Sequence, residues 1–324
     1  MIESFPALAL LAALIGIIGL AVGAVTASAS ARFLLSDSHP PELRCRRVER
    51  IAALPVAVSM LAILVLALPA VLKLAGLIDD HCLAHGLHHP HFCLRHLPAL
   101  EAGPLVLMLT AAAAWPITGL VRTALDQFRH ARLASCIARL AQAQRRLIVT
   151  DSDSPGAFLL GIRKPRIVLT TGLIRKLSAA ERRAVVRHEI AHARAGDLAR
   201  RLVLGLMMST QFPPTRRRLI HHWSQAAEER ADDAVAASGK GLDLASALVK
   251  ILRDGAPERA TDAHAIGANS ADVARRVKRL ADRPPEPLPS NWPESTLIAV
   301  LGLIALGLAS QHHALETFVG WLAQ

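Results

Sequence analysis

The sequence predicts a mainly α-helical integral membrane protein, with about four transmembrane helices and one soluble α+β domain that contains a small sheet. Hydrophobic residues make up 52% of the 324 residues. Several uncharged apolar runs are longer than a soluble core requires. Between these runs lies a stretch of mixed composition that is long enough for one compact core. Short β-branched segments bounded by Gly and Pro add strands to the helices of this stretch.

Four apolar segments are candidate membrane spans. The first, residues 5–30, carries no charge, and only Glu3 precedes it, so it lacks the basic region of a cleaved signal peptide. The other three are residues 51–71, 104–121 and about 293–310. They predict a membrane domain with three spans (1–124), a soluble domain (125–289) and a C-terminal span with a short tail (290–324).

Arginine residues orient these spans. They crowd the loop between the first two spans and the segment after the third, whereas the loop 78–103 contains only Arg95. The positive-inside rule then places the N-terminus, this loop and the C-terminal tail outside, with the soluble domain in the cytoplasm. We therefore expect a multi-pass protein of a bacterial cytoplasmic membrane.

The net charge of +11 raises the question of nucleic acid, but aromatic residues make up only 3% of the chain and Tyr is absent. No stacking or helix-turn-helix pattern accompanies the basic residues. Attraction to anionic lipid headgroups explains the arginines better, and we expect no direct binding of nucleic acid.

Within the soluble domain, alternation and turn residues predict a helix over about 121–144, three short strands and a polar helix over 270–281. The expected strands are 146–150, 158–160 and 166–170. The apolar stretch 202–212 is too short to span a bilayer. It either dips into the membrane or forms a buried core helix.

His188-Glu189-Ile190-Ala191-His192 is the most informative stretch. Ser178 and Glu181 form a capping-box pattern that predicts a helix over 179–195. Two histidines four residues apart share one helical face, where both imidazoles can bind one metal ion. Glu189 can then reach a water beside that ion, which is the geometry of a zinc peptidase.

A third ligand is expected from the segment Glu228 to Asp232. Glu228 and Asp232 share one face of a helix, so Glu228 is our third ligand and Asp232 supports a ligand imidazole. Asp197 is a further supporting carboxylate. Glu229 and Asp233 suit the metal less well, and a solvated acidic face is the alternative interpretation of the whole segment.

The strand 166–170 is a candidate for holding the substrate backbone by strand addition, through Ile167, Val168 and Leu169. The alternative is a strand of the sheet core.

The segment "GIRKPRIVLTTGLIRKLSAAERRAVVRHEIAHARAGD" with the later "EERAD" resembles the membrane gluzincins. Two branches share the pattern: antibiotic-sensing transducers of the BlaR/MecR type and quality-control proteases of the HtpX type. The resemblance implies one zinc ion held by His188, His192 and Glu228, with Glu189 as general base and Asp232 in support. It also implies, from "ARRVKRL", a substrate or oxyanion contact for Arg276.

Three spans before the catalytic domain and one after it match the BlaR/MecR arrangement better than that of the HtpX type. The resemblance departs from the antibiotic sensors in one respect. No Ser stands three residues before any of the six Lys residues, so we expect no acylation by β-lactams at an S-x-x-K motif.

Two C-x-x-H units mark the loop 78–103, formed by Cys82 with His85 and by Cys93 with His96. Three interpretations of this loop remain open: it holds a second metal site, it contains a disulfide between Cys82 and Cys93, or it does neither. Cys45 and Cys136 are expected to be unpaired thiols.

Three functions fit these observations. The leading hypothesis is a zinc endopeptidase that transduces an external signal by cleaving itself or a cytoplasmic transcriptional repressor. The second is a quality-control protease for membrane proteins, and the third is a metal-binding membrane receptor without catalysis.

Overall fold

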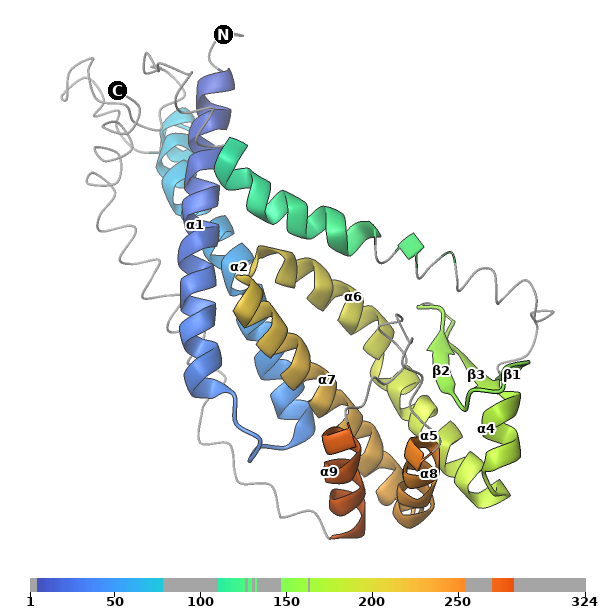
Figure 1. Ribbon diagram of the computed structural model, residues 1–324. Helices are drawn as coiled ribbons and strands as arrows, with labels where there is room; N and C mark the ends of the chain where they lie inside the picture. The colour runs from blue at the N-terminus through green and yellow to red at the C-terminus, as the bar shows by residue number, and fades with distance from the viewer. Residues whose placement is uncertain are drawn as a thin grey trace.

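The computed structural model describes residues 5–77, 110–125, 128–129, 132, 147–162, 164–253 and 270–282. Two long helices, α1 (Phe5–Leu34) and α2 (Pro41–Leu74), pack along each other as a hairpin (Figure 1). Glycines permit this close packing. A Cβ at Gly19 would lie 2.6 Å from the Cα of Ser59, and one at Gly23 would lie 2.4 Å from the Cα of Pro55.

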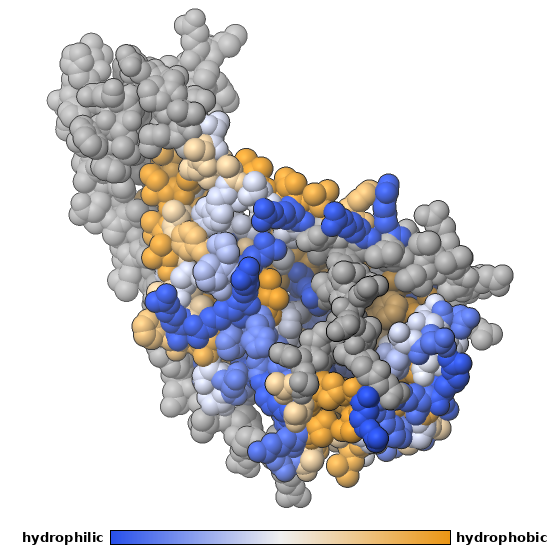
Figure 2. Space-filling model, in the orientation of Figure 1, coloured by the Kyte–Doolittle hydropathy of each residue, from blue (hydrophilic) through white to orange (hydrophobic). Residues whose placement is uncertain are grey.

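Within the described residues, two segments are long and apolar enough to cross a membrane, Ala12–Leu34 and Pro41–Val65. They overlap the first two predicted spans, 5–30 and 51–71, with shifted bounds. The third predicted span is described only from residue 110, as part of a helix over 110–125, and the fourth lies outside the described residues. Figure 2 shows apolar residues gathered on the visible part of the hairpin and on the helix 110–125.

The beginning of α2 packs against α6 (Asp197–Met207) and α7 (Pro213–Ala236). Buried residues of the three helices form one core cluster, which includes Val48, Ile51, Leu54, Leu204, Leu219 and Trp223. The stretch 202–212 therefore lies against this core as the end of α6 and the short helix η2 (Met208–Thr210). Its other face exposes Val203 and Leu206.

The sheet contains β1 (Leu147–Thr150), β2 (Ala157–Leu160) and β3 (Arg166–Thr170), in the order β1-β3-β2. β3 pairs in parallel with β1 and antiparallel with β2. The three predicted strands are confirmed, but the assignment of β3 as the substrate-binding edge is wrong. Ile167, Val168 and Leu169 have a strand on each side, so their backbone groups are not free to receive a peptide. In the described sheet, β2 is the edge strand that contacts α5 (Ala179–Ala195).

α5 follows the sheet and the short helix α4 (Thr171–Lys176). The predicted capping box begins α5: Glu181 N donates to Ser178 Oγ at 3.3 Å, and Ser178 N donates to Glu181 Oε2 at 2.7 Å. Gly196 ends α5 with a φ of 69°, which suits glycine, and α6 starts at the next residue. This abrupt turn places Asp197 beside the last turn of α5.

The helix α8 (Gly241–Arg253) packs against α5 and α7, and α9 (Ser270–Ala281) packs against α7 and α8, close to the lower end of the hairpin (Figure 1). A second core cluster joins them to the sheet and includes Leu169, Leu173, Val185, Val235, Leu244 and Val273. α5 and α7 are thus held between two cores, and the side chains between them are fixed in place.

Candidate metal centre

Two imidazoles from α5 and one carboxylate from α7 converge between the two cores. His188 Nε2 and His192 Nε2 lie 3.1 Å apart. Glu228 Oε2 lies 3.2 Å from His188 Nε2, and Glu228 Oε1 lies 3.5 Å from His192 Nε2. A tetrahedral zinc ion with bonds of about 2.0–2.1 Å would separate its ligand atoms by about 3.3 Å. The three side chains therefore fit one zinc ion.

Each histidine has a second carboxylate at its other ring nitrogen. His192 Nδ1 lies 2.6 Å from Asp197 Oδ2, and His188 Nδ1 lies 3.1 Å from Asp232 Oδ1. Since a carboxylate only accepts, the Nδ1–H of His192 is the donor, and the lone pair of Nε2 is then free to face a metal.

Arg276 on α9 holds the carboxylates of α7. It donates to both oxygens of Asp232 at 2.8 Å, and its Nη1 lies 3.0 Å from Glu228 Oε2. Even so, Glu228 Oε2 is buried without a hydrogen bond of good geometry among the described residues. A carboxylate oxygen left in this state beside two imidazole nitrogens suits a cation.

The charges around the two imidazoles favour positive charge between them. Burial would lower the pKa of His192, but the charge of Glu228 and the hydrogen bond to Asp197 raise it to about 10. Burial likewise opposes the raised pKa of His188, which Asp232 and Glu228 produce. The pKa of Glu228 lies well below its usual value because Arg276 and His192 outweigh its burial. Glu228 is therefore anionic over the physiological range.

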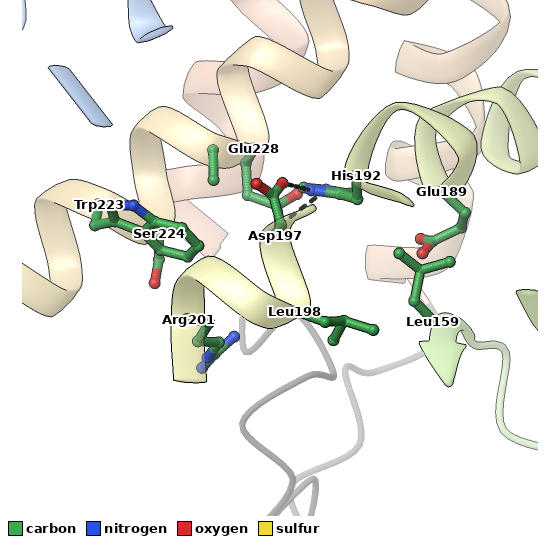
Figure 3. A pocket seen from close by; sticks show the side chains of 10 residues that line it. Leu159, Glu189, His192, Asp197, Leu198, Arg201, Trp223, Ser224 and Glu228 are labelled. Carbon is green, nitrogen blue, oxygen red and sulfur yellow. Dashed lines mark hydrogen bonds and ion pairs between the residues drawn. The ribbon is translucent and has the colours of Figure 1, made fainter. Parts of the chain in front are cut away.

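Glu189 behaves differently from the other carboxylates. It is only 5% exposed, and burial raises its pKa, although the two histidines oppose this shift. It lines the same pocket as His192 and Glu228, across from the ligand face of α7 (Figure 3). A carboxylate with a raised pKa near a metal set is suited to accept a proton from water.

A second layer of ion pairs ties the site to α2. Arg230 on α7 donates to Asp197 and, at 2.7 Å, to Glu42 Oε2. Next to the ligand Glu228, Glu229 accepts from Arg44 of α2 and from Arg279 of α9, each at 2.6 Å. The hairpin of α1 and α2 thus contacts residues that support the metal set.

The structure brings most of the predicted site residues together: His188, Glu189, His192, Glu228, Asp232, Asp197 and Arg276. Glu229 points away from the metal set, as its position on α7 predicted. Cys45 is buried and unpaired. The loop residues Cys82, His85, Cys93 and His96, as well as Cys136, lie outside the described residues.

Sequence reasoning missed several residues of the pocket and its surroundings, namely Leu159, Leu198, Arg201, Trp223 and Arg230. The four-residue spacing of Asp197 and Arg201 on one helix is the one signal that points to Arg201.

Two histidines and a glutamate held between packed helices, with a buried glutamate beside them, define a metallopeptidase domain. Residues 124–283 match the model of peptidase family M48. This match to a zinc-dependent family supports the broader resemblance to membrane gluzincins and does not separate its two branches. Comparison with curated proteins found no match.

Proposed function

We propose that the protein is a membrane-associated zinc endopeptidase. The observation that carries this proposal is the ligand set of His188, His192 and Glu228 beside Glu189. A zinc ion held there would supply a Lewis acid that activates water and stabilises the oxyanion of the scissile carbonyl. Glu189 takes the proton from the attacking water and passes it to the leaving amine.

The substrate backbone lies along β2 in this proposal. β2 is the edge strand of the described sheet, it contacts α5, and its Leu159 lines the pocket with Glu189. A peptide added to this edge would run past the metal set and present its backbone carbonyl to it.

Glu189→Gln tests the catalytic role. Gln keeps the size of the side chain but cannot accept a proton, and Glu189 is not one of the three ligands. We expect the purified variant to retain zinc, measured by metal analysis, and to lose at least about a hundredfold in peptide cleavage. The control is Asp243→Asn, an acid of α8 whose partner is Lys240 and which contacts none of the site residues in the described structure. Undiminished cleavage by Glu189→Gln would remove Glu189 from the mechanism.

We further propose that cleavage is directed at the protein itself or at a cytoplasmic repressor, in response to an external signal. The support is the contact of α2 with the metal site, through Glu42 with Arg230 and Arg44 with Glu229. A shift of α2 would therefore move Arg230 and Glu229, which lie next to the residues that hold the metal ligands. This proposal includes a bacterial cytoplasmic membrane, contact with anionic headgroups, and the peptidase domain on the cytoplasmic side.

Quantitative proteomics of membranes from cells that express wild type or Glu189→Gln tests this role, with and without added copper or zinc. We expect one or a few cleaved proteins, and cleavage that depends on the external stimulus. Stimulus-independent cleavage of many misfolded membrane proteins would contradict signalling and support quality control. If zinc-bound wild type cleaves no protein, this result would support a metal-binding receptor without catalysis.

A further inference from the structure

The pocket beside the metal set extends away from Glu189 along α6 and α7. Figure 3 shows Glu189 and Leu159 at one end, and Arg201, Trp223 and Ser224 at the other. Its full lining comprises Leu159, Glu189, His192, Asp197, Leu198, Arg201, Trp223, Ser224, Ala227 and Glu228. A peptide that reaches the metal set would therefore place a neighbouring side chain at the Arg201 end.

Arg201 differs from the other arginines around the site. Arg200 pairs with Glu49, Arg230 with Asp197, and Arg276 with Asp232. Arg201 is half-buried and forms no hydrogen bond or ion pair with any residue that the structure describes. Burial lowers its pKa, and only the more distant charge of Glu228 opposes this shift. A partly desolvated guanidinium without a partner is costly unless a ligand supplies an acceptor.

We propose that Arg201 forms a specificity subsite that binds a carboxylate of the substrate, with the apolar walls of Trp223 and Leu198 beside it. The carboxylate belongs to an Asp or Glu side chain near the scissile bond or to the C-terminus of the peptide. Because Arg201 lies at the end of the pocket away from Glu189, it selects the substrate and takes no part in the proton transfer. This inference rests on the proposed peptidase function.

The test compares peptides that differ only in Glu, Gln or Lys at each position, each with a free or an amidated C-terminus. Full-length protein in detergent is used with zinc, and cleavage products are read by mass spectrometry. We expect wild type to prefer Glu at one position, or the free over the amidated C-terminus. The first result assigns the carboxylate to a side chain and the second to the chain end.

In Arg201→Gln, the ratio of kcat/KM between the acidic and the neutral peptide should fall roughly tenfold or more, because a hydrogen-bonded charge pair is lost. Arg201→Glu should shift the preference to Lys at the same position. The control is Arg217→Gln, an exposed arginine of α7, which should keep the ratio of wild type. An unchanged ratio in Arg201→Gln, or an equal loss for all peptides, would overturn the subsite.

A binding measurement separates this inference from the proposed function. Fluorescence anisotropy of the same labelled peptides with zinc-loaded Glu189→Gln needs no turnover. If wild type cleaves no peptide but acidic peptides bind more tightly, and Arg201→Gln in this background removes the difference, the endopeptidase proposal fails and the subsite stands. If neutral and acidic peptides are cleaved and bound equally well, the subsite fails and the peptidase stands.

Discussion

The two ligand histidines are each held by a carboxylate that is itself held by an arginine. His188 contacts Asp232, which binds Arg276, and His192 contacts Asp197, which binds Arg230. Each carboxylate orients the imidazole and strengthens its lone pair, so it contributes to metal affinity without touching the ion. Asp197 also accepts from Arg230, which in turn contacts α2. Substitution of Asp197 is therefore more informative than substitution of Asp232.

Asp197→Asn should weaken zinc binding by about tenfold to a hundredfold. The amide is a weaker acceptor for the Nδ1–H of His192, and it leaves Arg230 beside an uncharged partner. Competition with a chromogenic chelator measures the zinc affinity of the purified protein.

Asp233→Asn is the matched control, because Asp233 lies on α7 and pairs with Arg279 rather than with a histidine. Equal zinc affinities of wild type and Asp197→Asn would show that Asp197 does not support the ligand.

At this scale, spacing predicted that His188 and His192 share one helical face, as do Glu228 and Asp232, and the structure brings the four side chains together. The role of Arg276 was predicted from the family resemblance rather than from spacing. The family resemblance predicted a substrate or oxyanion contact for it, and in the described structure it binds Asp232 and Glu228. Pairs such as Arg230 with Asp197 join helices whose packing no local pattern encodes.

The helix that bears both histidines is anchored at its start by Glu181. This carboxylate accepts from the backbone N–H of Ser178, from Ser246 at 2.6 Å and from Lys250 at 2.9 Å. Burial would raise its pKa, but these donors lower it from 4.5 to about 2. Its contribution to stability is therefore complete above about pH 4.5 and is lost as the pH falls through about 2.

Glu181→Gln should reduce the free energy of unfolding at neutral pH by about 1–3 kcal/mol, because the charged acceptor is lost. The difference from wild type should shrink as the pH falls below about 4.5, since protonation then removes the same charge from wild type. Thermal unfolding of both proteins over this pH range measures it.

The control for Glu181 is Asp243→Asn, an acid of α8 whose partner Lys240 lies 3.6 Å away near the surface. A difference between wild type and Glu181→Gln that persists unchanged in acid would show that the effect is not one of charge.

The start of α2 reaches the metal set through three side chains. Glu42 accepts from Arg230, Arg230 donates to Asp197, and Asp197 orients His192. If α2 positions the ligand by this route, Glu42→Gln should weaken zinc binding by about 0.5–2 kcal/mol. A double-mutant cycle with Arg230→Gln should show that most of this effect disappears once Arg230 is absent.

Glu49→Gln is the control for docking alone. Glu49 also lies on α2 and accepts from Arg200 at 2.8 Å and from Trp223 at 2.9 Å, but it does not touch Arg230. Equal losses in Glu42→Gln and Glu49→Gln, or additive losses in the cycle, would mean that α2 stabilises the domain without positioning His192.

Among the elements, the helix over 179–195 and the strand over 166–170 were predicted with nearly their observed bounds, because caps, turn residues and alternation are local signals. The place of β3 in the sheet was not. Its buried Val168 and Leu169 suit the centre of a sheet, but strand order depends on pairing between distant segments.

In the whole molecule, the charged start of α2 packs against α6 and α7, and its apolar remainder continues along α1. Glu42 and Glu49 of α2 form ion pairs with arginines of α7 and α6. Beyond Leu54, α2 packs against α1. Figure 1 shows the peptidase elements extending from one end of this hairpin. The metal set therefore lies near one end of the two candidate spans, where under the proposed function a substrate chain that leaves the membrane would meet it.

Such a chain would meet the metal set in an extended conformation if it adds to β2. The contribution of its backbone N–H groups to binding should then alternate from one residue to the next. In an antiparallel or parallel ladder, alternate backbone groups point to the neighbouring strand. Methylation of successive backbone nitrogens in a cleaved peptide should therefore abolish binding at every second position and be tolerated between them. Binding to zinc-loaded Glu189→Gln measures this pattern, with side-chain alanine substitutions at the same positions as the control. A uniform tolerance of methylation would exclude strand addition at β2, because a ladder requires every second backbone N–H of the peptide as a donor.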